Sequence, residues 1–329
     1  MGLRSAQERA APSPVARLAV ALPLAILAVG ATAGGSRAQI VQPARDAYRA
    51  LVLQAPASVE AAAYGNAPHL RGGAADLLFY APALIGRAGG MAASLHRYGP
   101  EGTLATLASK GSVGLGDFAV GLQYMRYGGA GTATLPDLQY AAFGDGEPVT
   151  EFAASLGYAR TLFGVVDAGV VARYLELHFL RALRDRALVV DLGVAREFGP
   201  AMVSLTARNL GSDVKTRTVT DITDRIPTQL ALGISTESFE VGELDMFLTS
   251  QIARRRDGEI IPAGGVEISY WPVQGYTFRL RGGLQRVVED RRSPFTFGLA
   301  FTGDALTLEY AFQAFDVDGN AHRFGLTLR

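Results

Sequence analysis

Apolar and polar residues alternate along most of the chain with a period of two, which is the period of a β-strand that has one dry and one wet face. The alternation is clear at the C-terminus, in the segments Pro294–Gly303, Ala305–Phe315 and Asn320–Arg329. The first of these segments places four large apolar side chains on one face: Phe295, Phe297, Leu299 and Phe301. The end of the chain therefore predicts three consecutive strands.

The same pattern recurs from Gly89 onward and predicts an all-β fold, a transmembrane antiparallel β-barrel of about 14 strands. Most segments are long enough for a tilted crossing of the membrane, which takes about 9–11 residues. The other segments are Gly89–Tyr98, Thr103–Lys110, Gly116–Tyr127, Thr150–Thr161, Val165–Phe179, Arg186–Phe198, Ala201–Asn209, Pro227–Glu237, Glu243–Arg254, Ile260–Trp271 and Gly275–Val287.

The lengths of the connections support this strand count. In such a barrel every connection from an even to an odd strand is a short periplasmic turn, and longer loops lie on the outer side. The two longest connections, Gly128–Val149 and Leu210–Ile226, both fall on the outer side. A soluble all-β protein such as a sandwich or propeller is the competing fold, because it also contains many alternating strands.

The parity of each strand predicts which side chains face lipid and which face inward. Arg or Lys on the lipid face near mid-membrane costs about 2–4 kcal/mol, so charges belong on the inner face. The predicted lipid-facing set includes Leu230, Leu232, Ile234, Tyr276, Phe278, Leu280 and Leu284. The charged residues on inward parity are the lumen-facing candidates Asp167, Arg173, Asp191, Arg208, Glu267, Arg279, Arg281 and Glu309.

The N-terminus has the three parts of a secretory signal peptide. Three arginines precede the apolar run Leu18–Val29, and small residues allow cleavage after Ala33 or Ala38. A membrane anchor is the alternative, but the apolar run is shorter than the roughly 20 residues of a spanning helix. We expect residues 1–38 to be removed on export, and the cell outer membrane to be the destination.

Residues 39–85 are rich in alanine and proline and lack alternation. We expect this N-terminal segment to lie outside the barrel wall, which is formed by residues 86–329. It either plugs the mouth or lumen of the barrel or forms a flexible periplasmic lead, since chain termini are commonly mobile. The fold prediction therefore includes a short N-terminal plug-like segment.

Composition and side-chain chemistry give no sign of an enzyme. The chain has no cysteine, so disulfides and thiolate metal sites are excluded. Its formal net charge is zero, which gives no reason to expect binding to nucleic acid. The four histidines, His69, His96, His178 and His322, have no serine or second histidine at a recognisable spacing. We predict no catalytic residue, metal site or cofactor.

Four blocks of sequence resemble two groups of outer-membrane proteins, the FadL-like and the PorV/PorQ-like families. The block GAADLLFYAPAL contains Phe79, Tyr80, Pro82 and Ala83, and has Ala81 where the families have asparagine. A second block contains Asn209 and Gly211 before Ile226-Pro227, and a third runs from Gly265 to Gly283. The last contains His322 and Arg323, and ends at Arg329 without the final aromatic residue that is frequent in the families.

The resemblance implies a fourteen-stranded barrel and two alternative functions. FadL-like proteins are conduits for small hydrophobic molecules, whereas PorV-like proteins are non-enzymatic components of protein secretion or surface attachment. The expected partners are therefore outer-membrane lipid with either a hydrophobic small molecule or secretion-system proteins. Basic residues near Arg181–Arg186, Arg254–Asp257 and Arg291-Arg292 lie at outer connections, either as solvated tips or as contacts to lipopolysaccharide phosphates.

Overall fold

The computed structural model describes residues 50–99, 102–127, 149–180, 183–216, 222–287, 292–315 and 319–328. The predicted signal peptide at 1–38 lies outside these residues, as do residues 39–49 of the N-terminal segment. Within the described residues, no helix has the length and apolar character needed to cross a membrane.

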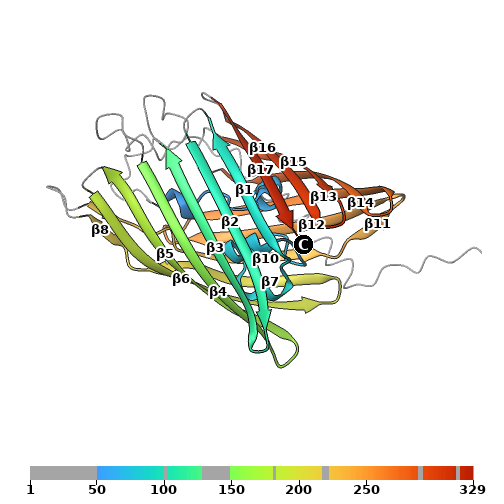
Figure 1. Cartoon of the computed structure of the whole chain (residues 1–329), viewed down its shortest axis with the longest axis horizontal. Coiled ribbons are helices and arrows are strands. Elements are labelled where there is room, and N and C mark those ends of the chain that lie inside the picture. The colour runs from blue at the N-terminus through green and yellow to red at the C-terminus, as the bar shows by residue number, and fades with distance from the viewer. Residues whose placement is uncertain are drawn as a thin grey trace, which may run out of the picture.

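The strands form one closed antiparallel barrel (Figure 1). Strands β10 and β11 both pair with the same edge of β12, and only Glu237–Ser238 separate them. They therefore count as one strand of the wall, and the barrel has 14 strands. The bounds are β1 Met91–Tyr98, β2 Gly102–Val113, β3 Gly116–Tyr127, β4 Val149–Leu162, β5 Val166–Leu180, β6 Leu183–Phe198, β7 Ala201–Gly211, β10 Gln229–Thr236, β11 Phe239–Val241, β12 Leu244–Arg255, β13 Ile260–Val273, β14 Tyr276–Gln285, β15 Arg292–Thr302, β16 Leu306–Phe315 and β17 Asn320–Leu328.

Pairing between the first and last strands closes the barrel, from Met91 opposite Leu328 to Tyr98 opposite Ala321. The predicted fold class is confirmed, and most predicted strand bounds agree to within a few residues. The long connection after β7 contains a small hairpin that the sequence pattern did not predict, β8 Val214–Thr216 with β9 Ile222–Asp224.

The outer face of the wall is apolar and exposed, as the alternation predicts. On β15, Phe295 is 56% exposed and Thr296 is 3% exposed. Two residues of the predicted lipid-facing set are nevertheless buried, Ile234 at 7% and Leu284 at 8% exposed. Ile234 packs against Ala201 on neighbouring β7, and Leu284 lies opposite Phe295 in the register, where cross-strand side chains shield one another.

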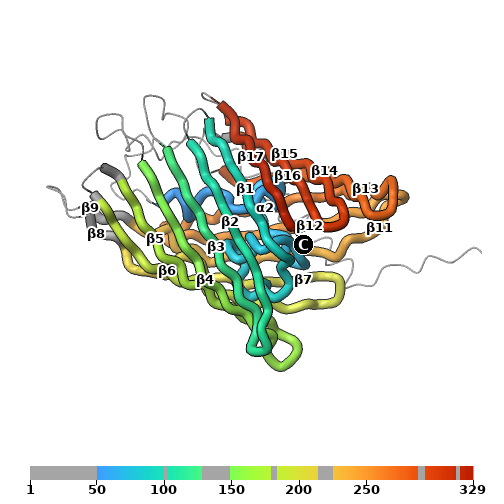
Figure 2. Tube along the Cα trace, viewed as in Figure 1, coloured from blue at the N-terminus to red at the C-terminus, as the bar shows by residue number. Residues whose placement is uncertain are grey.

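Residues 50–89 lie inside the barrel between its near and far walls (Figure 2). They comprise the described part of the predicted N-terminal segment and the four residues that follow it, and they are called the N-terminal segment below. Its elements are η2 Leu51–Leu53, α2 Val59–Ala63, η3 Ala75–Phe79 and η4 Pro82–Arg87. Helix α2 begins where the hydroxyl of Ser58 accepts a hydrogen bond from the Ala61 amide at 3.2 Å, which satisfies one free donor of the first turn. Helix α2 contacts β14 to β17, whereas η4 contacts β3 to β6.

One irregularity of the wall lies beside this segment. The register between β6 and β7 shifts between Val190 and Leu192. Asn209 has a positive φ of 56° there, a conformation that asparagine tolerates better than most residues. The Asp191 carboxylate accepts a hydrogen bond from the Asn209 amide at 2.6 Å, so this bulge leaves no unpaired buried amide at Asn209.

Candidate functional site in the barrel lumen

Small residues on the inner face of the wall allow the N-terminal segment to approach the strand backbones. A Cβ atom on Gly169 would lie 2.2 Å from the Pro82 carbonyl oxygen, and one on Gly283 would lie 2.2 Å from the Gly65 nitrogen. A Cβ atom on Gly157 would lie 2.6 Å from the side chains of both Leu78 and Ile85. Small inward residues therefore leave room in the lumen, and the N-terminal segment occupies it.

A cluster of charged side chains ties helix α2 to the wall. Arg281 on β14 is 2% exposed, and its guanidinium donates to three carboxylates. The partners are Glu267 on β13 at 2.7 Å, Glu309 on β16 at 2.5 Å and Glu60 on α2 at 2.8 Å. Arg279 lies 3.5 Å from Glu267. Four of the lumen-facing candidates thus meet at one point, and a fifth member of the cluster, Glu60, comes from the N-terminal segment.

Two other residues of the N-terminal segment complete this cluster. The hydroxyl of Tyr64 donates to Glu267 at 2.6 Å, and its ring lies under the Arg281 guanidinium at 5.3 Å. His69 Nδ1 lies 3.3 Å from Glu60. Burial alone would raise the pKa of Glu60, but the positive charge of Arg281 and then that of His69 hold it at about 2. Glu60 therefore stays ionised and paired at any physiological pH.

The buried carboxyl of Asp76 in η3 makes the seating of the N-terminal segment pH-dependent. Burial, and then the negative charge of Glu309, raises the pKa of Asp76 from 3.8 to about 7. Its contribution to stability is complete below pH 3.8 and is lost between pH 3.8 and about 7, at about 1.4 kcal/mol per pH unit, with no further loss above about 7. We therefore expect hydrogen exchange of residues 50–89 to quicken from about pH 4 to about pH 7 and then to level off, because the folded state holds a proton over this range that the unfolded state has already lost.

The Asp76→Asn variant is the matched control for this pH dependence, because it is neutral throughout. Its exchange rates, corrected for intrinsic chemistry, should stay level over the same range. An equally steep pH dependence in the variant would assign the effect to another group.

A second buried cluster joins β4 to β7. Arg173 donates to Ser155 at 3.0 Å, to Asp191 at 2.9 Å and to the Asn209 side chain at 3.1 Å. The Asn209 amide group in turn donates to the Pro227 carbonyl at 3.0 Å. Arg173 also lies over the ring of Phe79 in the N-terminal segment, 5.9 Å from its centroid. The cluster holds the bulge and one aromatic side chain of the segment together.

A cavity of 160 Å³ lies between the N-terminal segment and the ends of the strands that carry the long loops. Its aromatic lining includes Phe79, Tyr80 and Tyr98, and its apolar lining includes Leu51 and Met125. Its charged lining consists of five arginines: Arg173, Arg208, Arg255, Arg286 and Arg323. No aspartate or glutamate lines it among the described residues. This lining suits an uncharged or anionic ligand better than a cationic one.

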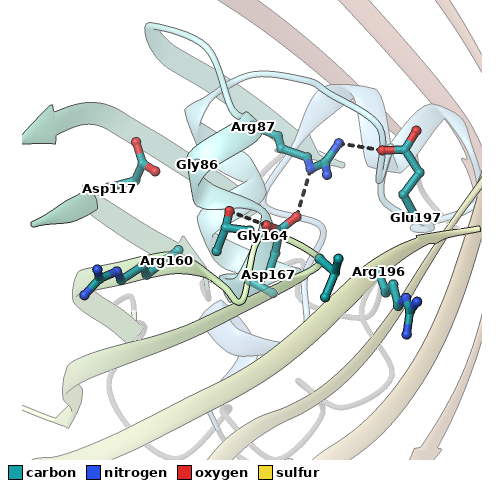
Figure 3. Close-up of a pocket in the computed structure, with 12 residues that line it drawn as sticks. Gly86, Arg87, Asp117, Arg160, Gly164, Asp167, Arg196 and Glu197 are labelled. Atoms are coloured by element: carbon teal, nitrogen blue, oxygen red, sulfur yellow. Dashed lines mark hydrogen bonds and ion pairs between the residues drawn. The ribbon is translucent and has the colours of Figure 1, made fainter. Parts of the chain in front are cut away.

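A second cavity, of 460 Å³, lies at the opposite end of the barrel, beside the short turns (Figure 3). Arg87 of η4 bridges Asp167 on β5 at 2.9 Å and Glu197 on β6 at 3.2 Å. Arg71 also pairs with Glu197, at 2.7 Å, and with Glu237. These ion pairs are partly exposed, and such pairs contribute only about 0–1 kcal/mol each, so this end of the segment is held more weakly than α2.

The residues of the family-like blocks fall into two groups, one in the N-terminal segment and one in the wall strands β7 and β17. Phe79, Tyr80, Pro82 and Ala83 form the buried contact between the N-terminal segment and the wall. A Cβ atom on Gly211 would lie 2.8 Å from the Leu188 carbonyl oxygen, so glycine allows β7 to pass this close to β6. In β17, His322 lies 2.8 Å from the Tyr310 hydroxyl, and Arg323 lies over the Tyr98 ring at 5.3 Å.

The structure also brings together residues that the sequence spacing did not connect. Glu151 is fully buried and accepts hydrogen bonds from the Val52 amide at 2.7 Å and the Tyr127 hydroxyl at 2.6 Å. His96 Nε2 lies 2.7 Å from the Ser94 hydroxyl, but its Nδ1 has no partner among the described residues. Without a third group to orient the ring, this pair lacks the geometry of a catalytic triad.

The basic outer connections are described only in part. Arg181 and Arg291 lie outside the described residues. In the tip that is described, Arg255 pairs with Asp257 at 2.6 Å and Arg256 with Asp213 at 2.8 Å. Contacts between these tips and lipopolysaccharide remain a prediction.

Comparison with known proteins relates this chain to solved barrels through its fold. No protein-family model matches the sequence, and no curated protein matches it. The Pseudomonas putida toluene transporter TodX is similar, with 10% identity, 81% of this chain and 95% of that chain covered, and a TM-score of 0.53. A Pseudomonas aeruginosa FadL homologue is similar over 82% of this chain and 97% of that chain, with 9% identity and a TM-score of 0.52. The likeness concerns the fold, a barrel of the FadL type.

Proposed function

We propose that this chain is a bacterial outer-membrane conduit of the FadL type, which moves small hydrophobic or amphipathic molecules across the membrane. The observation that carries the proposal is the N-terminal segment seated inside a closed barrel, with a cavity on the side of the long loops. Because the described residues of the segment occupy the lumen, solutes in this proposal pass through a binding step in the cavity.

The solved neighbours support the same proposal. One is described as a toluene transporter and another as a FadL homologue. Both share the barrel fold with this chain, and fold alone carries little functional weight. The proposal therefore depends on the combination of this fold with an occupied lumen and an apolar exterior.

In this proposal the N-terminal segment is the plug. It is held firmly at α2 through Arg281 and weakly at the short-turn end through Arg87. A ligand that enters from the long-loop side would enter the cavity lined by Phe79 and Tyr80, and the weaker end of the segment would yield toward the periplasm. No observation on the described residues favours the alternative role in secretion or surface attachment.

Uptake of the hydrophobic fluorophore N-phenyl-1-naphthylamine into intact Gram-negative cells tests the proposal. The lipopolysaccharide leaflet excludes this dye, and its fluorescence rises when it reaches the inner leaflets. Cells that express the chain should take it up several-fold faster than cells with an empty vector. Cells that express another closed barrel at equal abundance are the control. Equal rates in all three would refute the conduit, and a stoichiometric protein partner after mild detergent extraction would favour the alternative.

A further inference from the structure

One row of outward-facing residues crosses seven neighbouring strands at the long-loop end of the barrel. The strands are β17, β1, β2, β3, β4, β5 and β6, which lie side by side in the near wall (Figure 1). Each member of the row lies opposite the next in the strand register, in the order His322, Arg97, Thr103, Arg126, Thr150, His178 and Arg184. We call these seven residues the outer row.

The side chains of the outer row point away from the lumen. Arg97, Arg126 and Arg184 are exposed. The preceding residues on β1 and β3, His96 and Met125, are buried inside the barrel. Because successive side chains of a strand point to opposite faces of the sheet, the arginines lie on the face of the wall that meets the membrane.

The outer row offers guanidinium, imidazole and hydroxyl groups, and none of its seven members is a carboxylate. A guanidinium donates in a planar fork that matches the oxygens of a phosphate. Adjacent strands are about 4.8 Å apart, so Arg97 on β1 and Arg126 on β3 are separated by about 10 Å, with the Thr103 hydroxyl between them. The row therefore presents several phosphate-binding groups side by side.

A largely apolar surface begins directly below the outer row. Two residues further along each strand, about 7 Å nearer the middle of the barrel, lies a second row: Phe324, Leu95, Ala105, Tyr124, Phe152, Glu176 and Arg186. Two residues further still lies a third: Leu326, Ala93, Leu107, Leu122, Ala154, Tyr174 and Leu188. A cationic level above apolar levels has the polarity of a lipid, with its headgroup above its acyl chains.

The one carboxylate of the second row orders the cations around it. Glu176 lies 2.6 Å from His178 Nε2 and 4.0 Å from Arg186 Nε, and it accepts a hydrogen bond from the Tyr174 hydroxyl at 3.0 Å. The Arg186 side chain is still 64% exposed. With Arg184 beside it on β6, the positive charges of this corner outnumber the single negative charge.

The same level on other strands is more apolar. Phe312 on β16 lies opposite His322, and Leu230 on β10 and Ile260 on β13 lie on either side of Arg254. The outward arginines are therefore concentrated on the side formed by β1 to β6. A ring of interfacial side chains that served only to position the barrel in the membrane has no reason to favour one side.

We propose that the outer row and the apolar rows below it bind lipopolysaccharide, the phosphorylated glycolipid of the outer leaflet. Longer loops of outer-membrane barrels lie outside the cell, so the row stands at the level of the outer-leaflet headgroups. The phosphates pair with Arg97, Arg126 and Arg184, and the acyl chains pack against residues such as Leu95 and Leu122. This inference concerns the outer surface of the wall and does not depend on transport through the lumen.

Native mass spectrometry of the full chain, released from a non-ionic detergent, tests this inference with four probes. The probes are lipopolysaccharide, the same glycolipid after enzymatic removal of its phosphates, phosphatidylglycerol and inorganic phosphate. We expect lipopolysaccharide to bind several-fold more tightly than each of the others, because it alone joins several phosphates to several acyl chains. Its binding should weaken as ionic strength rises.

Two results would overturn the inference. Equal binding of lipopolysaccharide and its dephosphorylated form would remove the role of the arginines. Equal binding of phosphatidylglycerol or inorganic phosphate would assign the surface to anions in general and remove the glycolipid.

Double variants assign the binding to the arginines. Arg97→Gln with Arg126→Gln should weaken lipopolysaccharide several-fold, and so should Arg184→Gln with Arg186→Gln. Arg97→Lys with Arg126→Lys should keep part of the affinity, because lysine retains the charge but not the planar fork. Unchanged binding in both glutamine pairs would contradict the assignment. If one pair fails to fold, the other still decides.

The opposite rim of the same strands supplies the matched control. Arg160 on β4 and Arg196 on β6 are exposed on outward positions near the short turns. Arg160→Gln with Arg196→Gln removes the same number of charges and should leave lipopolysaccharide binding unchanged. An equal loss in this pair would show that overall charge, rather than the outer row, determines the binding.

Discussion

Replacement of Arg281 by glutamine is expected to release helix α2 from the barrel wall. The variant would leave Glu60, Glu267 and Glu309 buried without their shared cation. Removal of one partner from a buried ion pair typically costs about 3–5 kcal/mol. We therefore expect rapid proteolysis and hydrogen exchange of residues 50–89, together with a larger single-channel conductance in planar bilayers.

Arg279→Gln is the control for this release. Arg279 lies on the same strand, two residues away, but its side chain is 22% exposed and its ion pair within the described part of the chain is with Glu267, at 3.5 Å. Its removal should cost less than about 1 kcal/mol. If residues 50–89 resist proteolysis and hydrogen exchange in both variants as well as they do in the parent, Arg281 does not anchor the segment.

A methyl group on the inner face of β14 should displace the N-terminal segment by a different route. In Gly283→Ala the new Cβ would lie 2.2 Å from the Gly65 nitrogen and 2.3 Å from the Tyr64 carbonyl carbon. Backbone atoms cannot move aside as the end of a flexible side chain can, and overpacking of this kind costs about 1–3 kcal/mol or more. We expect loss of protection in residues 50–89 and a lower melting temperature.

The neighbouring glycine supplies a closely matched control. A Cβ on Gly282 would meet nothing within 4 Å, because this residue points to the opposite face. Gly282→Ala should therefore leave melting temperature and exchange unchanged. Similar losses in both variants would indicate that alanine disturbs the strand itself rather than the contact with the segment.

Local periodicity was enough to predict the barrel. Alternation over eight to sixteen residues determines which face of each strand is apolar, and the lengths of the connections determine the direction of each strand. The pairing of β1 with β17 follows once the strand count is even. Only local exceptions were missed, such as Ile234 and Leu284, whose burial depends on neighbours in adjacent strands.

The contacts inside the lumen could not be predicted in the same way. Glu60 and Arg281 are 221 residues apart in sequence, and Tyr64 and Glu267 are 203 apart. The N-terminal segment has no period that indicates which side chain meets which strand. Parity did select the inward arginines and carboxylates of the wall, but it did not indicate that Arg281 also pairs with Glu60 of the N-terminal segment.

The seam between β1 and β17 has a consequence for how the molecule must fold. The two seam strands lie at opposite ends of the wall sequence, so the cylinder stays open until β17 pairs with β1. Bringing such distant ends together costs chain entropy that grows with the logarithm of their separation. The N-terminal segment touches both flanks of that opening, β1 through η3 and β17 through α2. It can therefore act as an internal template that brings the two free edges into register before they join.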